Sequence, residues 1–244
     1  MTPELVYACL VVLAGYLVLG VIGFGSALLI VPLLSWIWPL SEVVLLVLLL
    51  DIPASVLFGW LNLKHVDFGE IGRLLPGMLA GSLLGLWLQG SVAPQWPLLG
   101  LGVYIAAVGI RALARAGRRA PVADRRWRAA AGVGSGFIEV MFATAGPVVL
   151  AWLHRRLESV HAVRATTPTA MVVCAATAVG VISMGGALAD GQLWLRWLGF
   201  LAISGIGVAL GNRVARYFPV EILARLVCAM LVASGALLVF RSLA

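Results

Sequence analysis

Residues 23–32 read Gly-Phe-Gly-Ser-Ala-Leu-Leu-Ile-Val-Pro, and residues 142–147 read Phe-Ala-Thr-Ala-Gly-Pro. Each stretch interrupts a long apolar run and ends in a proline, and a second proline follows in the next apolar run. The two closing prolines are 115 residues apart, and the same spacing separates Pro53 from Pro168. A helix break that recurs in two halves of an apolar chain is typical of transporters, which bind substrate at such breaks near the bilayer midplane.

The composition indicates a membrane protein. Of the 244 residues, 62% are hydrophobic and 11% are charged, whereas a soluble domain has roughly a quarter charged residues. The net charge of +7 would also suit a nucleic-acid partner. The arginines, however, lie in short gaps between apolar runs, which is typical of topology signals, so we expect no nucleic acid. The start of the chain has no basic n-region, and we therefore expect its first apolar run to remain in the membrane.

The apolar runs form two halves, residues 1–114 and 128–244, joined by a basic linker at 115–127. Several runs reach the ~20 residues that span a bilayer, while those beside the two breaks are shorter. The predicted runs are 5–22, 24–36, 41–62, 71–90 and 95–114 in the first half, and 128–142, 145–153, 160–185, 192–212 and 220–241 in the second. The sequence thus predicts an all-α polytopic protein whose halves each contain a broken helical hairpin and three transmembrane helices.

The distribution of basic residues predicts that the two halves are inverted. If each hairpin returns to its starting side, fifteen Lys and Arg residues face one side and only Arg196 and Arg241 face the other. By the positive-inside rule the first side is cytoplasmic, as in an inner (plasma) membrane, and both termini lie outside. Hairpins that are re-entrant and hairpins that cross fully give the same count, so both remain open.

Several motifs, in order and in duplicate, resemble the TauE/SafE sulfite-exporter family of membrane permeases. They are Gly-Phe-Gly-Ser with Val-Pro-Leu-Leu at 31–34, the glycines at 132 and 136, Ala-Thr-Ala-Gly-Pro at 143–147, and Arg-Ala-Thr-Thr at 164–167. The helices that follow Asp67 and Asp190 carry glycines at spacings that suit helix packing. The resemblance covers nearly the whole chain. It implies a transporter of a small anion, such as sulfite or an organosulfur anion.

The two breaks are also candidates for binding the anion. A helix that begins in the membrane exposes free N–H groups and the positive end of its dipole, which together attract anions. Glycines allow the backbone to approach a ligand closely, and hydroxyls can donate hydrogen bonds to it. The predicted substrate-binding residues are Gly23, Gly25, Ser26, Thr144, Gly146, Thr166 and Thr167. Alternatively, the Ser and Thr hydroxyls bond only to backbone carbonyls freed by the breaks.

Asp51 and Glu139 are predicted to lie deep within apolar runs. Ionisable groups at that depth are costly to bury, and function is the default explanation. Either carboxyl could carry a proton and couple anion movement to the proton gradient. Alternatively, either could pair with Arg164 or cap a broken helix. Arg164 itself could attract the anion, form the ion pair, or extend to the membrane interface.

A proton-coupled secondary transporter is the leading prediction, with protons, the anion and membrane lipid as partners. A passive anion channel and an intramembrane enzyme are the alternatives, but hydrolase and metalloprotease motifs are absent from the sequence. The three cysteines and three histidines lack the spacing of metal ligands. We therefore expect no metal or cofactor, and the sequence leaves the oligomeric state open.

Overall fold

The computed structural model describes residues 3–59, 66–93, 95–114, 126–157 and 159–215. Within these ranges the chain forms nine α-helices, one 3₁₀ helix and no strand, which confirms the all-α prediction. The first half contains α1 (Pro3–Ile22), α2 (Ser26–Leu34), α3 (Leu40–Gly59), α4 (Phe68–Ser91) and α5 (Gln95–Ala114). The second half contains α6 (Arg126–Phe142), α7 (Gly146–Arg156), α8 (Val160–Ser183), η2 (Ala187–Ala189) and α9 (Gly191–Val214).

In the part of the chain that the structure describes, five helices are long and apolar enough to cross a membrane: α1, α3, α4, α8 and α9. The apolar part of α5 is shorter and covers Gln95–Val108. The two helices that follow the breaks are short, with 9 residues in α2 and 11 in α7. The predicted runs thus match the described helices closely. Most of the predicted linker and the predicted run 220–241 lie outside the described residues, and α6 begins at Arg126, inside the predicted linker.

The helices recur in the same order in both halves, but with a spacing that differs from the proline spacing. The first residues of α2 and α7, Ser26 and Gly146, are 120 residues apart, and those of α3 and α8 have the same spacing. Pro32 lies near the end of α2, whereas Pro147 is the second residue of α7. The 115-residue spacing of the prolines therefore does not mark equivalent positions, and the inversion of the halves remains a prediction.

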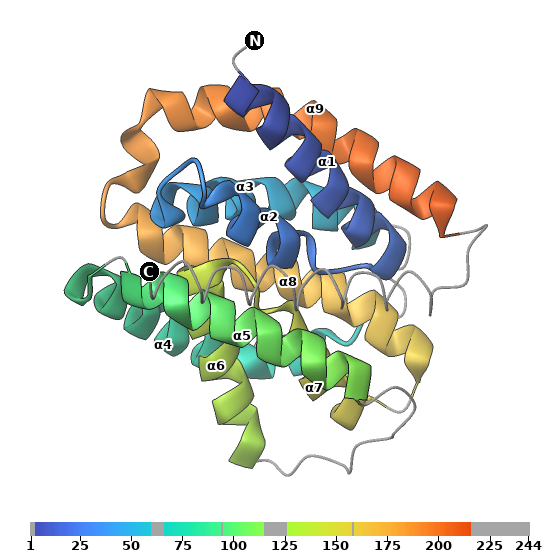
Figure 1. Cartoon of the computed structure of the whole chain (residues 1–244). Helices are drawn as coiled ribbons and strands as arrows, with labels where there is room; N and C mark the ends of the chain where they lie inside the picture. The colour runs from blue at the N-terminus through green and yellow to red at the C-terminus, as the bar shows by residue number, and fades with distance from the viewer. Residues whose placement is uncertain (1–2, 60–65, 94, 115–125, 158, 216–244) are drawn as a thin grey trace.

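The two halves interlock through glycine-lined helix contacts. A β-carbon at Gly81 of α4 would collide with Val133 and Phe137 of α6, and one at Gly211 of α9 would collide with the backbone of α1. In Figure 1, α9 lies along α1 on one side of the molecule, while α4 and α6 lie on the other. Glycine allows this close approach of backbones in lipid. Each half thus packs its glycine-rich helix against the opening helix of the other half.

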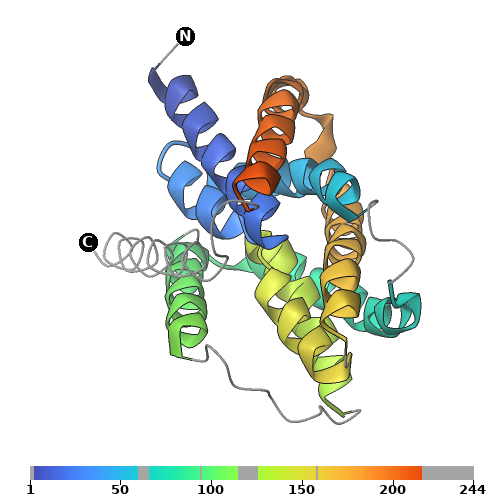
Figure 2. The ribbon, with the colours of Figure 1, turned by 90° about the vertical axis from the view of Figure 1, so that its right-hand side faces the viewer.

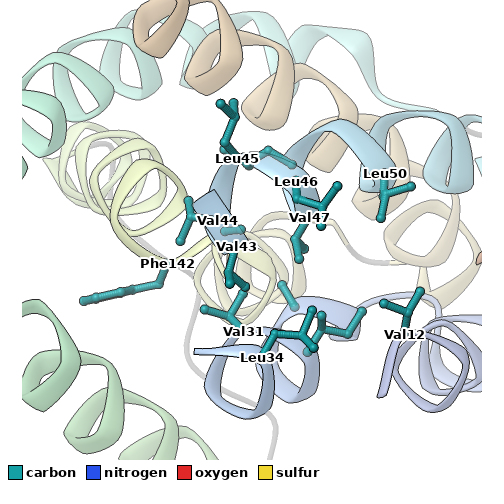
Figure 3. Close-up of a cluster of buried hydrophobic side chains, with 14 of the residues drawn as sticks. Val12, Val31, Leu34, Val43, Val44, Leu45, Leu46, Val47, Leu50 and Phe142 are labelled. Atoms are coloured by element: carbon teal, nitrogen blue, oxygen red, sulfur yellow. The ribbon is translucent and has the colours of Figure 1, made fainter. Parts of the chain in front are cut away.

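The apolar residues of α3 form much of the core, where they pack against residues of α1 and α2. Figure 3 shows its side chains, such as Val43, next to Val31 and Leu34 of α2, and Val12 of α1 belongs to the same buried cluster. These residues are at most 6% exposed. Because α3 is fixed by this packing, a polar residue on it takes a defined position beside the break between α1 and α2.

A candidate functional site where two helix breaks meet

The first break covers residues 23–25 and the second covers residues 143–145. Gly23 and Gly25 have φ values of 92° and 97°, a left-handed conformation that glycine adopts without strain. At the second break Ala143, which lies 120 residues after Gly23, has a φ of 55°. A non-glycine residue in this region stores strain of about 1–2 kcal/mol. Both breaks therefore depend on a left-handed residue directly after the preceding helix.

The tips of the two hairpins touch each other. A β-carbon placed on Gly146 would lie 3.2 Å from Cδ2 of Phe24. Between the tips is a cavity lined by residues 23–28 of the first break, by Ala143, Thr144, Gly146 and Pro147 of the second, and by Leu19, Asp51, Ser55 and Met171. The cavity measures about 20 Å³, which is enough for about one water molecule. The structure therefore brings the two sequence-predicted breaks together around a small polar cavity.

Asp51 lines this cavity from α3 and is 7% exposed. Its Oδ1 accepts one hydrogen bond from the Tyr16 hydroxyl and another from the Ser26 hydroxyl, each 2.8 Å long. Tyr16 belongs to α1, and Ser26 is the first residue of α2. One carboxylate oxygen thus connects the helices on both sides of the first break. Hydrogen bonds to a charged group contribute about 1.5–3 kcal/mol each, so this is a firm anchor.

Glu139 is fully buried in α6 and holds the second tip from a different direction. Its Oε2 accepts a 2.8 Å hydrogen bond from the backbone N–H of Ala145, the residue before α7. Neither Glu139 nor Ala145 is among the residues that line the cavity. Within the described part of the chain, Glu139 Oε1 has no hydrogen-bond partner. Of the helix-capping and functional interpretations, the contact at Ala145 matches helix capping.

The hydroxyl groups at the two tips differ in their bonding. Ser26 is bound to Asp51, whereas Thr144 Oγ1 is buried beside the cavity without a partner among the described residues. The Thr144 carbonyl accepts a 2.9 Å hydrogen bond from the Tyr104 hydroxyl of α5. An unpaired buried hydroxyl costs free energy. A hydrogen-bonding ligand in the cavity would remove that cost.

Two of the sequence-predicted substrate-binding residues lie away from this cavity. Thr166 accepts a hydrogen bond from the backbone N–H of Asp67, and the Thr167 hydroxyl donates to the carbonyl of Val163 in its own helix. Neither is part of the cavity lining. Arg164 belongs to α8, and its side chain is outside the described set. The structure thus gathers Gly23, Gly25, Ser26, Asp51, Thr144 and Gly146 at the cavity.

Sequence reasoning missed Tyr16 and Ser55. Tyr16 is a buried tyrosine in the middle of an apolar helix, and such a hydroxyl normally has a partner. Ser55 follows Asp51 by four residues, which places both on one face of α3. Both signals were available in the sequence. By contrast, nothing in the sequence indicates that Met171 of α8 lines the same cavity.

Among the described residues, two ion pairs connect the halves, and none of their members lines the cavity. Arg156 of α7 contacts the buried Glu70 of α4 at 3.1 Å, and Arg73 shares the same Glu70 oxygen at 2.8 Å. Arg196 of α9 contacts Glu42 of α3 at 2.8 Å. In the predicted topology the first pair is cytoplasmic and the second is on the opposite side. Both pairs cross between halves, so both restrain relative movement of the halves.

The apolar membrane-length helices and the composition define a multi-pass membrane protein with two helix breaks meeting at a buried polar cavity. The chain belongs to the sulfite exporter TauE/SafE family, which matches residues 7–238, and is thus a membrane transporter of this type. It is 48% identical over 191 residues to the probable inner membrane transporter protein TsaS of Comamonas testosteroni. The match covers 78% of this chain and 80% of that protein. No solved structure matches the chain.

Proposed function

We propose that this protein is a secondary transporter that moves a small anion, sulfite or an organosulfur anion, together with protons. The observation that carries the proposal is the meeting of both helix breaks at a cavity that contains a buried carboxyl, Asp51, and an unpaired hydroxyl, Thr144. Such a site offers hydrogen-bond donors to an anion and a place for a proton. The TauE/SafE family and the named relative support the transporter class.

The donors at the site suit an anion better than a cation. Both α2 and α7 begin at the cavity, so the positive ends of their dipoles point toward it. The N-cap residue of α2 is Gly25, so no side chain at that position caps the first N–H groups of the helix. Gly146 and the unpaired Thr144 hydroxyl contribute from the opposite tip. These groups can replace part of the hydration shell of an anion without a full positive charge in the membrane.

Asp51 supplies the proposed proton coupling. An ionised carboxylate in the cavity repels an arriving anion, whereas a protonated one is neutral and can donate a hydrogen bond to it. The anion and a proton on Asp51 therefore bind together more readily than the anion alone. Glu139 acts from behind the second tip, so any coupling through Glu139 works by releasing the N–H of Ala145 and with it the tip.

Transport requires the hairpin tips to separate. A cavity with room for about one water is too small for sulfite. We propose that the halves rock around the tips, and that opening toward each side breaks one ion pair, Glu70–Arg156 or Glu42–Arg196. In the topology that we propose, the basic linker is cytoplasmic and both termini are outside. The predicted inverted repeat would make the two openings related movements of equivalent helices.

Flux of labelled sulfite into proteoliposomes, with and without an imposed pH gradient, tests this function. Methanesulfonate is the matched second probe, because its charge stays constant where sulfite changes its own protonation. We expect the gradient to accelerate uptake of at least one probe in wild-type protein and to have no effect in protein-free vesicles. Uptake that equilibrates at the same rate with and without the gradient would instead indicate a passive channel.

A further inference from the structure

A second cavity lies between α5, α6 and α7 and is separate from the site at the tips. It measures about 450 Å³, within the roughly 300–1,000 Å³ of ligand-binding clefts. Small apolar residues form most of its walls, among them Ala107 of α5, Ala131 of α6 and Ala151 of α7. Figure 2 shows α5, in green, standing apart from the yellow helices α6 and α7. We call this cavity the α5 groove.

The α5 groove has one end at the hairpin tip and the other at the last turn of α7. Tyr104 and Pro147 lie at the end next to the hairpin tip, and Pro147 also lines the cavity at the tips. Arg155 lies on the last turn of α7, on the side of the groove where Trp127 of α6 is 63% exposed. Along α7 the distance from Pro147 to Arg155 is about 12 Å, at 1.5 Å per residue. The groove thus runs from an interfacial cation and tryptophan toward the apolar interior.

We propose that the α5 groove binds one acyl chain of an anionic phospholipid, whose headgroup phosphate pairs with Arg155. Arginine binds phosphate through charge-assisted hydrogen bonds, and an exposed tryptophan in the lining of the same groove, Trp127, is typical of the membrane interface. The small side chains leave a largely apolar space of about 450 Å³ between the three helices, which can accept a hydrocarbon chain. The topology proposed above places Arg155 on the cytoplasmic side, where anionic lipids attract basic residues. On that topology, the bound lipid belongs to the inner leaflet.

A lipid in this groove would act on the hairpin tip through α5. Tyr104 lines the groove, and its hydroxyl holds the carbonyl of Thr144 at 2.9 Å. The Tyr104 ring also stacks on Phe142, the last residue of α6, with centroids 6.3 Å apart. These contacts connect α5 to the second break at one end of the groove. A chain wedged beside Tyr104 therefore sets the position of the tip that carries Thr144.

Native mass spectrometry of the full-length protein tests lipid binding without any transport measurement. Phosphatidylglycerol and phosphatidylcholine with identical acyl chains are the probes. We expect preferential retention of phosphatidylglycerol, and the Arg155→Gln variant should lower it about fivefold, the effect of one basic residue at a membrane surface. The matched control is Arg213→Gln, which removes the same charge from α9, a helix that does not line the groove.

Two alanine-to-leucine variants test the groove itself. Ala107→Leu and Ala151→Leu each fill part of it, whereas Ala202→Leu adds the same atoms to an exposed position on α9. We expect the first two to lower phosphatidylglycerol retention and the third to leave it unchanged. Equal retention of both lipids, or equal effects of Arg155→Gln and Arg213→Gln, would overturn the proposal. Retention of a second protein copy, lost in Ala107→Leu, would assign the groove to a dimer and overturn it as well.

Discussion

The two hairpin tips are held by buried carboxylates in different ways. At the first tip Asp51 reaches from a third helix, α3, and binds the side chains of Tyr16 and Ser26. At the second tip Glu139 belongs to the hairpin itself and binds the backbone N–H of Ala145. Asp51 lines the cavity, and Glu139 does not. The two tips thus differ: the first places an ionisable group in the cavity, and the second presents a hydroxyl without a partner among the described residues.

The largest expected effect follows from removing the ionisable group at the first tip. Asp51→Asn should reduce gradient-driven anion accumulation to the level of protein-free vesicles, because an amide carries no titratable proton. Exchange of labelled for unlabelled anion should persist. The matched control is Asp190→Asn, which changes an exposed carboxylate at the start of α9. Wild-type accumulation in Asp51→Asn would remove Asp51 from the coupling mechanism.

The equivalent change at the second tip should act mainly on stability. Glu139→Leu leaves the buried N–H of Ala145 unpaired and should lower the free energy of unfolding by about 2–3 kcal/mol. Glu139→Gln keeps an acceptor oxygen and should lower the free energy of unfolding by a smaller amount. Thermal unfolding in detergent measures both. If Glu139→Gln were fully stable yet lost accumulation as completely as Asp51→Asn, the two carboxylates would share one role and the contrast between the tips would fail.

Removing the hydroxyl at each tip should change the free energy of unfolding in opposite directions. Ser26→Ala removes a hydrogen bond to Asp51 and should lower the free energy of unfolding by about 1.5 kcal/mol. Thr144→Val removes an unpaired buried hydroxyl at constant volume and should raise it by up to about 1 kcal/mol. Thr144→Val should also raise the KM for the anion about tenfold, the value of a hydrogen bond to a charged group. Unchanged KM would mean that Thr144 does not contact the anion.

The smallest effects concern the left-handed residues. Gly23→Ala introduces a side chain at a φ of 92° and should lower the free energy of unfolding by about 1 kcal/mol. Ala143→Gly, at a φ of 55°, should release strain and raise it by less than about 1 kcal/mol. Equilibrium unfolding in detergent compares the two. Loss of stability in Ala143→Gly would show that the alanine side chain contributes packing that outweighs its strain.

The sequence predicted the helices well because apolar length and glycine breaks are local signals. The sequence also singled out Ser26, Thr144 and Asp51, which line the cavity between the tips, and Glu139, which contacts Ala145; their roles in binding and coupling stay predictions. The sequence could not distinguish the roles of the two carboxylates. The side of the tip that each carboxylate faces depends on how α3 and α6 pack. The partners of Asp51 lie 25 and 35 residues away in the chain, beyond any local pattern. Thr166 and Thr167 matched a motif, but their hydrogen bonds lie elsewhere.

The 115-residue spacing of the prolines differs from the 120-residue spacing between the first residues of α2 and α7 and of α3 and α8. Pro32 and Pro147 share a local neighbourhood of small and apolar residues, but they occupy different turns of α2 and α7. The residue that does recur is the left-handed one after the opening helix, which is Gly23 in one half and Ala143 in the other. An alanine gives no sequence signal for a positive φ, so the 120-residue spacing of the helices next to the breaks could be recognised only from the backbone.

The glycine-lined contacts between halves determine the order in which the chain can assemble during synthesis. The partner of α1 is α9, the last helix described, and the partner of α4 is α6, which emerges only after the linker. Until those helices arrive, lipid must cover the glycine-rich face of α4 and the face of α1 that later meets α9. A ribosome that stops before residue 126 therefore leaves two unmatched surfaces in the bilayer. Two separately produced halves, in contrast, carry complementary faces and should find each other there.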